Sequence, residues 1–309
     1  MQHTIILSPL FLDEDCFHVF ASAVAEATSS IEDHRFSFLV INDGSGPIQL
    51  SGKSPYTIVN LHRNIGHQKA IAIGLAYARE HLRYDHIIIM DCDGEDRPED
   101  IPELIKGLQS NNEIVVAKRI NRQEGKPFRV FYILYKMLFR ILTGKKISFG
   151  NFMLLSNKAV TTIVHYSEIW NHLAGGIIKS RIPYGSVDTR RGKRYRGKSK
   201  MNFNSLVLHG LGAIGVFIEI TAMRLLIFSV LMILASLITI AIIFFIKFFT
   251  DNAIPGWATS AVSSMLILLL QSFLLSLFTV FLYLSSQGQK KFIPAHHYKD
   301  YVLSIENHH

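Results

Sequence analysis

Cysteine is scarce in this sequence, which has only Cys16 and Cys92 among 309 residues. Two cysteines cannot form a framework of several disulfides, and their separation does not match the spacing of zinc-binding cysteines. The N-terminal stretch MQHTIILSPLFLDED also lacks an apolar run long enough for a signal peptide. We therefore expect two reduced, buried thiols and a first domain that stays in the cytoplasm.

Charged residues are absent from residues 225–246 (LLIFSVLMILASLITIAIIFFI), a run long enough to cross a hydrocarbon core about 30 Å thick. A second apolar run covers about 257–284 and has one strongly polar interruption, Gln271. Because the connector is short, the two runs are predicted to form a transmembrane helical hairpin, with a soluble hairpin as the alternative. We expect Gln271 to form a hydrogen bond within the hairpin rather than a lipid or partner contact.

Basic residues lie at the outer ends of the hairpin, with Arg224 before the first run and Lys290 and Lys291 after the second. The connector has only one Lys and one Asp. Since cytoplasmic flanks carry an excess of Lys and Arg, the N-terminal domain and the tail, 285–309, are predicted to be cytoplasmic. The sequence thus predicts a multi-pass protein of the cell (inner) membrane.

Two further segments have an interfacial pattern. Residues 128–146 are apolar except for Arg129, Lys136 and Arg140, which share one helical face, and for Lys145 and Lys146 at the end. This pattern is typical of a helix lying in the headgroup plane, which we expect over about 128–143. A buried core helix with snorkelling cations is the alternative. Residues 203–224 are predicted to form a second interfacial helix that leads into the first span.

Residues 1–120 alternate short apolar strands with helices, which predicts an α/β domain with a parallel sheet and crossover helices. The expected strands are TIILS, FSFLVIND, YTIVN, HIIIMDCD and EIVVAK. Helices are expected to begin at about Asp13, Gly66 and Pro98. Ligands of such sheets gather beyond the carboxyl ends of the strands.

Acidic residues follow two of these strands: Asp43 in VINDGSG, and Asp91, Asp93 and Glu95 in HIIIMDCDGEDRPEDI. Asp91 and Asp93 flank a single residue, so both can reach one hard divalent cation. Mg²⁺ or Mn²⁺ takes oxygen ligands of this kind and shares them with substrate phosphates. The following acid, Asp96, is expected to be a helix N-cap.

A basic run, RRGKRYRGKSK, occupies residues 190–200. Such a run suits nucleic acid, anionic headgroups or a bound phosphate. Nucleic acid is disfavoured because the run closely precedes an apolar span and contains one aromatic residue, Tyr195. We therefore expect a phosphate or membrane partner and no nucleic acid.

Five motifs together resemble the family 2 glycosyltransferases of the GT-A fold: INDGS, NIGHQKAIAIGLAYA, DCDGEDRPEDIPELI, GNFMLLSNKAV and RYRGKSKM. With the two C-terminal spans, the chain resembles the polyisoprenyl-phosphate, dolichol-phosphate-mannose-synthase-like group. The resemblance covers almost the whole chain, in the family's order and spacing. It implies a GT-A, Rossmann-like nucleotide-sugar-binding domain over 1–202, followed by interfacial helices and the hairpin.

The resemblance also implies a donor site for a UDP- or GDP-hexose. Asp91 and Asp93 would hold the metal and the donor diphosphate, and Glu95, where the family usually has Gln, would add a charge to the metal shell. Asp43 would read the base or ribose, with an Asx-turn as the alternative. Pro9 and Lys69 are expected in the same donor site. For Lys69, the alternative is a position on a solvated helix face.

For the acceptor, the R-x-x-G-x-S-K pattern of a mobile loop matches Arg194, Gly197, Ser199 and Lys200. This loop would close over the phosphates of donor and acceptor, and Arg194 joins Asp91 and Asp93 as an implied catalytic residue.

The acceptor implied by the resemblance is a polyprenyl monophosphate, whose phosphate Arg119, Arg129, Arg194, Ser199 and Lys200 would contact. For the flanking Arg190, Arg191 and Lys193, attraction to headgroups is preferred.

The family's GDF reads Gly150, Asn151, Phe152 here, so a carboxylate is lost and no catalytic role is assigned to Asn151. A phosphate monoester with a second pKa near ~6 is already ionised at neutral pH and needs no base. One direct displacement would invert the anomeric carbon and give a lipid-linked sugar for cell-surface glycans. A processive polysaccharide synthase and a non-catalytic membrane scaffold stay as alternatives, and homo-oligomer formation is left open.

Overall fold

A computed structural model describes residues 1–50, 55–108, 112–120, 126–197, 203–250, 256–288 and 290–308; side chains are described for these residues except at 126–132 and 203–205. The chain divides into two compact units. The first contains 1–132, 146–216 and 291–309, and the second contains 133–145 and 217–290.

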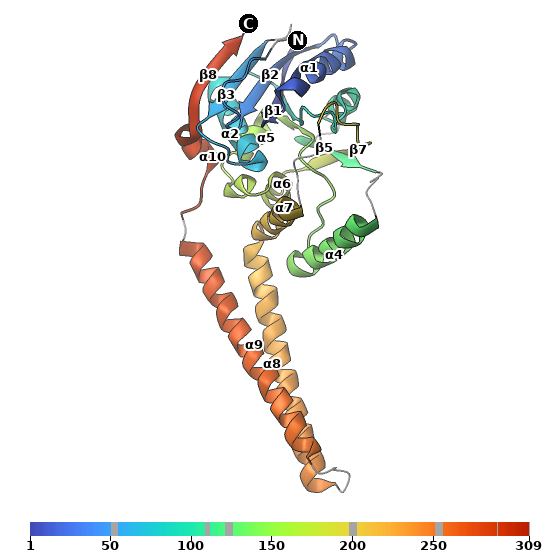
Figure 1. Cartoon of the computed structure of the whole chain (residues 1–309), viewed down its shortest axis with the longest axis vertical. Helices are drawn as coiled ribbons and strands as arrows, with labels where there is room; N and C mark the ends of the chain where they lie inside the picture. The colour runs from blue at the N-terminus through green and yellow to red at the C-terminus, as the bar shows by residue number, and fades with distance from the viewer. Residues whose placement is uncertain are drawn as a thin grey trace. The chain divides into compact units, whose positions relative to one another are not determined.

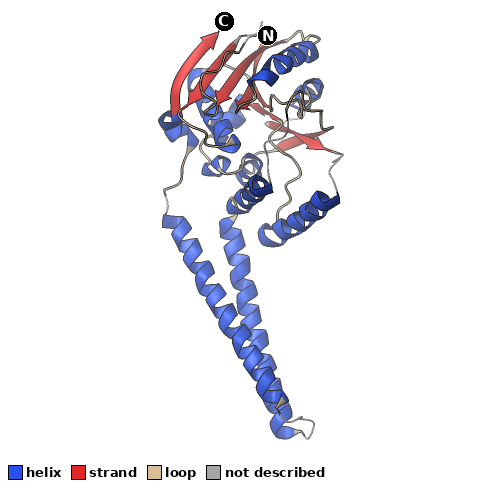
Figure 2. Cartoon of the chain, viewed as in Figure 1, coloured by secondary structure: helices blue, strands red, loops and turns tan. Residues whose placement is uncertain are grey.

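The first unit is built on one eight-stranded sheet with the order β7-β5-β6-β4-β1-β2-β3-β8 (Figures 1 and 2). Its centre is parallel, with β1 paired to both β2 and β4, and β2 paired to β3. These four strands are β1 (Gln2–Leu10), β2 (His34–Asn42), β3 (Tyr56–Leu61) and β4 (His86–Ile89). The strands predicted from the apolar runs in this region are confirmed.

The outer strands make the sheet mixed rather than wholly parallel. Strand β6 (Met153–Ser156) runs antiparallel to β4 and to β5 (Ile114–Arg119), and β7 (Tyr184–Thr189) is parallel to β5. The C-terminal strand β8 (Val302–His308) pairs antiparallel with β3. Strands β6, β7 and β8 were not expected from the sequence, because their runs are short or mostly exposed.

Two hydrophobic cores cover the two faces of the sheet. One face packs against α2 (His67–His81) and the helices that follow β6, and the other packs against α1 (Glu14–Thr28) and α3 (Ile101–Gly107). The remaining short helices of this unit are η1 (Pro98–Asp100), α5 (Asn157–Ile163), η3 (Ser167–Trp170), α6 (Leu173–Ser180), α7 (Phe203–Gly215), α10 (Pro294–His297) and η4 (Tyr298–Tyr301). Because β1, β2 and β4 are parallel, the loops that follow them lie at the same end of the strands.

The C-terminal tail is part of this unit. Tyr298 is buried, and its hydroxyl donates to Glu80 at 2.9 Å and lies 2.7 Å from Nε2 of His81. Phe292 stacks on Trp170 with ring centroids 3.7 Å apart. The tail that follows the second apolar run therefore returns to the sheet and ends as its edge strand.

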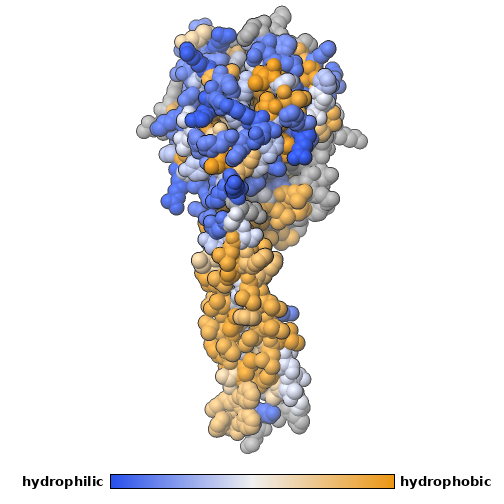
Figure 3. Space-filling model, turned by 90° about the vertical axis from the view of Figure 1, so that its left-hand side faces the viewer, coloured by the Kyte–Doolittle hydropathy of each residue, from blue (hydrophilic) through white to orange (hydrophobic). Residues whose placement is uncertain are grey.

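The second unit contains two helices long and apolar enough to cross a membrane, α8 (Ile218–Phe249) and α9 (Trp257–Gly288). Only 17% and 11% of their most apolar windows are buried, so they are not core helices of this chain. Their surface is hydrophobic on the face shown in Figure 3. The two helices pack against each other, as the hairpin prediction requires.

Most of the buried side chains of α8 and α9 are small. They are Thr221, Ala222, Ser229, Ser236 and Ile243 on α8, and Ala258, Ser272 and Thr279 on α9; apart from Thr221, they recur at seven residues or a multiple of seven. Small residues let helix backbones approach closely. Gln271 immediately precedes the buried Ser272, about 100° round the helix. Its side chain is exposed and forms no hydrogen bond with another described residue, so the bond expected within the hairpin is not found.

Helix α4 (Lys126–Thr143) covers the first segment expected to be interfacial. Its large apolar side chains Ile133, Met137 and Ile141 are each more than half exposed, which does not fit the alternative of a buried core helix. The second segment is divided, because α7 ends at Gly215 and α8 begins at Ile218.

Candidate active site

The carboxyl ends of the parallel strands β1, β2 and β4 lie at the same end of the sheet, and the site lies beyond them. The register pairs Leu10 with Asn42, and the backbone N–H of Met90 donates to Leu7 at 3.1 Å. Asp43 follows β2 and Asp91 follows β4. Both therefore lie beyond the carboxyl ends of the parallel strands, as parallel pairing predicts. Pro9 lies inside β1, where it pairs with Ile41 and is buried.

Asp43 holds the turn before α2. Its two carboxylate oxygens accept hydrogen bonds from the backbone N–H groups of Ile65 at 2.8 Å and Gly66 at 2.9 Å. Burial raises the pKa of Asp43, and these two bonds oppose that rise. The alternative of a local Asx-turn is not found at Asp43. The N–H of Ser45 instead donates to the side chain of Asn42 at 3.1 Å.

Asp91 is the least neutralised acid of the site. Its Oδ1 is buried and, among the described residues, has no hydrogen-bond partner. Nε2 of His67 lies 3.4 Å away, but burial lowers the pKa of His67, so this ring supplies no positive charge at neutral pH. Burial, followed by the charges of Asp96 and Asp93, raises the pKa of Asp91 well above its usual range. A site of this kind favours a cation.

The three acids that follow Asp91 most closely are each paired with an arginine. Asp93 accepts from Arg194 at 2.8 Å, Glu95 from Arg191 at 2.7 Å, and Asp96 from Arg119 at 2.8 Å. Arg119 also lies 4.0 Å from Glu95, and Arg194 lies 3.2 Å from Asp13. Three of these contacts join residues about a hundred or more positions apart in the sequence.

Two of these contacts differ from the sequence-based expectations. Asp96 is not a helix N-cap, because its carboxylate accepts from Arg119 and from the N–H of Asp91 at 3.1 Å, and Arg97 takes the N-cap position of η1. Arg191 was assigned to headgroup attraction but is paired with Glu95. Asp13 was not expected in the site, since a lone acid before a helix carries no signal of its role.

The basic segment lies directly on the acidic turn. The N–H of Tyr195 donates to the carbonyl of Asp93 at 2.8 Å, and the N–H of Gly192 donates to that of Glu95 at 2.9 Å. Gly94 has φ of +91°, and a Cβ there would lie 2.9 Å from the carbonyl oxygen of Lys193. The close approach therefore requires a glycine in this turn.

Asn151 is hydrogen-bonded beside Asp91. Its amide nitrogen lies 2.9 Å from Nε2 of His67, and its oxygen accepts from Gln68 at 3.0 Å. Gln68 in turn accepts from the N–H of Leu173 at 2.6 Å. The position of the family's missing carboxylate is thus occupied by a neutral amide that positions His67.

The other predicted cations form no ion pair with these acids among the described residues. Lys69 lies 5.4 Å from the ring centre of Trp170, a cation–π contact. Ser199, Lys200 and the side chain of Arg129 lie outside the described residues. The structure therefore brings together Asp91, Asp93, Glu95, Arg119 and Arg194 from the predicted set.

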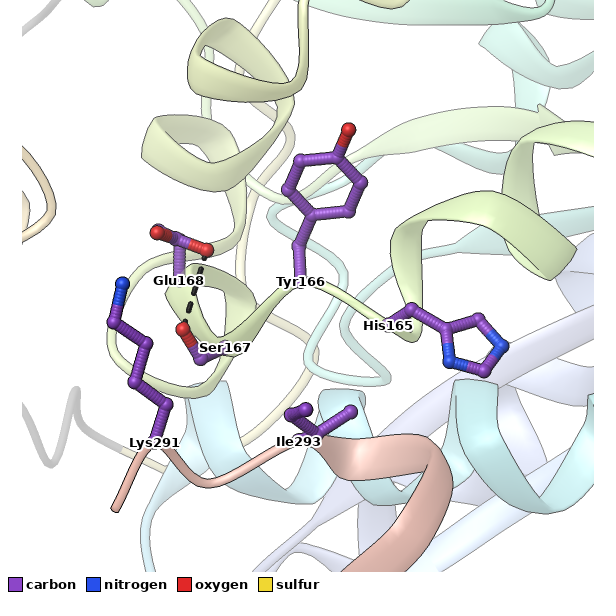
Figure 4. A pocket seen from close by; sticks show the side chains of 6 residues that line it. All are labelled: His165, Tyr166, Ser167, Glu168, Lys291 and Ile293. Atoms are coloured by element: carbon purple, nitrogen blue, oxygen red, sulfur yellow. Dashed lines mark hydrogen bonds between the residues drawn. The ribbon is translucent and has the colours of Figure 1, made fainter.

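A separate open pocket lies between η3 and the C-terminal tail (Figure 4). It shares no residue with the acidic turn. Its lining residues are His165, Tyr166, Ser167, Glu168, Lys291 and Ile293. Glu168 is already paired with Lys179 at 3.0 Å, which leaves Lys291 as the main charge at its rim.

Comparison with known proteins agrees with the position of this site. The family model described as glycosyl transferase family 2 matches residues 11–164, which include Asp43 and the acidic turn. An uncharacterized glycosyltransferase, YkcC of Bacillus subtilis (strain 168), is 24% identical over 86% of this chain and 84% of its own.

Two relatives have more specific names. The bactoprenol glucosyl transferase of Shigella phage SfV is 28% identical over 69% of this chain and 72% of its own. The undecaprenyl-phosphate 4-deoxy-4-formamido-L-arabinose transferase of Shewanella sediminis (strain HAW-EB3) is 27% identical over 65% of this chain and 62% of its own.

Among solved structures, the glucosyl-3-phosphoglycerate synthase of Mycobacterium tuberculosis, in complex with Mn²⁺, UDP and glucosyl-3-phosphoglycerate, matches with a TM-score of 0.49. It is 14% identical, and the match covers 71% of this chain and 80% of that chain. From the family match and its named relatives, the chain is a glycosyltransferase that carries the glycosyl transferase family 2 domain over residues 11–164.

Proposed function

We propose that this chain transfers a hexose from a UDP- or GDP-hexose to a polyprenyl monophosphate, with inversion at the anomeric carbon. The observation that carries the proposal is the docking of an arginine-rich segment on a strand-end acidic turn, in a chain that also has two exposed apolar helices. The names of the bactoprenol and undecaprenyl-phosphate relatives support the acceptor. The product would be a lipid-linked sugar for cell-surface glycans, made in the inner membrane with the catalytic unit in the cytoplasm.

The residues present fit a divalent cation at Asp91. Its buried, unpartnered Oδ1 and its raised pKa leave an acid that a hard cation would satisfy. Among the described residues no group of three acids, histidines or cysteines is arranged to hold a metal without help. We therefore expect Asp91, with Asp93, to hold Mg²⁺ or Mn²⁺ together with the diphosphate of the donor. When bound, the metal stabilises negative charge on the departing diphosphate.

Arginine supplies the remaining positive charge. Arg194 is paired with Asp93 and Asp13, and its side chain is 16% exposed. Its planar guanidinium can bind two phosphate oxygens at once, which makes it suited to align donor and acceptor phosphates. Arg119, bound to Asp96, lies in the same charged network and can contribute to the field around the acceptor phosphate.

No general base is needed if the acceptor is a phosphate. The neighbours of Asp91 are an amide, Asn151, and His67, whose ring nitrogen is engaged by that amide. A polyprenyl phosphate is already an anion at neutral pH, so its oxygen can attack directly. Catalysis then consists of aligning two anions and stabilising the leaving group.

The acceptor is tested by comparing polyprenyl phosphate with polyprenol in detergent, using the full chain and a panel of UDP- and GDP-hexoses. Only the phosphate should be glycosylated. Arg194→Ala should lower the rate by roughly ten- to more than hundredfold, since a charge-assisted contact is worth about 1.5–3 kcal/mol.

Arg196→Ala is the matched control, because Arg196 carries the same charge in the same segment and its side chain is exposed. It should keep most of the activity. Comparable turnover of the free alcohol would mean that a base exists, and the acceptor assignment would be wrong.

A further inference from the structure

The C-terminal strand β8 reaches the loop of Asp43 through two buried asparagines. Asn60 on β3 is 8% exposed and Asn42 on β2 is 2% exposed. The amide nitrogen of Asn60 donates to Ser304 at 3.0 Å and to Glu306 at 2.6 Å, both on β8. Residues two apart on a strand share one face, so both acceptors approach Asn60 from the same side.

The second step leads from Asn60 to Asn42. The amide nitrogen of Asn42 donates to the side-chain oxygen of Asn60 at 2.8 Å and to the carbonyl of Gly46 at 2.8 Å. The side-chain oxygen of Asn42 accepts from the N–H of Ser45 at 3.1 Å. All four amide hydrogens and both amide oxygens of the pair are thus used, and the hydroxyl of Ser45 also accepts from the N–H of Leu12 at 2.9 Å.

The orientation of each amide is therefore set by the next. Both amide hydrogens of Asn60 point to oxygens of β8, which leaves its own oxygen to face Asn42. The nitrogen of Asn42 must then face Asn60, and its oxygen faces Ser45. Buried networks in which every member is satisfied favour one arrangement of their side chains. Loss of the β8 acceptors would leave a buried N–H group unsatisfied and free the amide of Asn60 to turn over.

We propose that Ser304 and Glu306 are positioning residues for donor binding, acting through Asn60 and Asn42 on the 43–46 loop. The inference rests on the proposed function, because Asp43 in this loop is the residue expected to read the base or ribose. The tail of the chain thereby takes part in forming the nucleotide site, although none of its residues belongs to the acidic turn. No contact between β8 and the nucleotide is required.

The test measures the dissociation constants of UDP and GDP with Mn²⁺ by equilibrium dialysis, on the full chain in detergent. Ser304→Ala/Glu306→Ala should weaken binding of the preferred nucleotide by about three- to tenfold, the range of one or two neutral hydrogen bonds. Glu306→Gln keeps an acceptor oxygen and should bind as the wild type does.

Asn307→Ala is the matched control. Asn307 lies on the same strand but accepts from Thr57 at 3.0 Å, outside the asparagine pair. It should leave nucleotide affinity unchanged. If it weakened binding as much as the double variant, or if the double variant bound as tightly as the wild type, the proposed positioning role would be wrong.

Asp43→Ala separates this inference from the proposed function. Loss of nucleotide binding in Asp43→Ala with an unaffected double variant would overturn only the role of the tail. Unchanged binding in Asp43→Ala, or no binding of either nucleotide by the wild type, would overturn the donor site itself. If the double variant unfolds, the comparison of Glu306→Ala with Glu306→Gln decides the question.

Discussion

The negative charge of Asp91 is not paired with a cationic side chain among the described residues. Three nearby acids are paired with arginines, while the buried Oδ1 of Asp91 has no hydrogen-bond partner among the described residues. Its carboxylate is therefore held in an environment that destabilises its charged form. Such arrangements occur where a group serves binding or catalysis rather than folding.

Asp91→Asn should abolish transfer and leave the protein as stable as the wild type or more stable. The substitution removes a charge that Asp93 and Asp96 repel, so the stability of the free protein should not fall. Measurements of hexose transfer and of the unfolding midpoint in detergent test the two effects together. EDTA should inactivate the wild type, and Mg²⁺ or Mn²⁺ should restore it.

Glu103→Gln serves as the control for a lost carboxylate, since Glu103 forms an exposed pair with Lys106 on α3. Its activity should match that of the wild type. Full activity of Asp91→Asn, or of the wild type in chelator, would contradict the metal role.

At the scale of elements, α6 begins at a histidine whose ring acts as the helix cap. Nδ1 of His172 accepts from the N–H of Gly175 at 3.0 Å, and its ring lies 4.5 Å from that of His209 on α7. Burial lowers the pKa of His172 to about 3. The cap requires the neutral ring, because a protonated Nδ1 could not accept.

The stability of the fold should therefore fall in mild acid. An unfolded histidine has a pKa of about 6.5, so the unfolded chain binds a proton that the folded His172 resists. The contribution of neutral His172 to the free energy of unfolding is fully present above about pH 6.5. It is lost progressively as the pH falls, by about 2 kcal/mol at pH 5. Unfolding midpoints in detergent between pH 7.5 and 5 measure it.

His172→Asn isolates this effect, because asparagine is a good N-cap that does not titrate. The variant should lose less stability than the wild type between pH 7.5 and 5. Equal losses in both proteins would show that His172 is not the source of acid sensitivity.

For the whole molecule, the two apolar helices decide on which side of a membrane the rest of the chain lies. The chain carries a net charge of +8, with Arg224 near the start of α8 and Lys290 and Lys291 after the end of α9. If α8 and α9 span the membrane, residues 1–217 and the tail share one side. The tail must share that side in any case, since it forms strand β8 of the sheet.

Asn252→Cys should react with a membrane-impermeant thiol reagent in intact cells, while Gln289→Cys should react only after lysis. The native thiols give a low background, because Cys16 and Cys92 are both buried and burial raises the pKa of each. Labelling in the opposite pattern would reverse the orientation and exclude a cytoplasmic donor.

The amino-acid sequence predicts the parallel centre of the sheet, the acids that follow its strands and the two apolar helices. These features are local: a strand of apolar residues, an acid at its end and a long run without charge each carry their own pattern. The arginine partners could not be predicted in the same way. The segment of Arg191 and Arg194 meets the acidic turn only after the chain has folded back across about a hundred residues.

The partners of each charge and the place of the tail in the sheet depend on the tertiary fold. Asp96 has the local pattern of an N-cap, yet burial near Arg119 makes an ion pair its better partner. The tail has no continuous apolar run. Strand β8 forms because distant segments supply its partners: β3 pairs with its backbone, and Glu80 on α2 accepts from Tyr298. Contacts between distant segments depend on the whole fold, and so local patterns do not contain them.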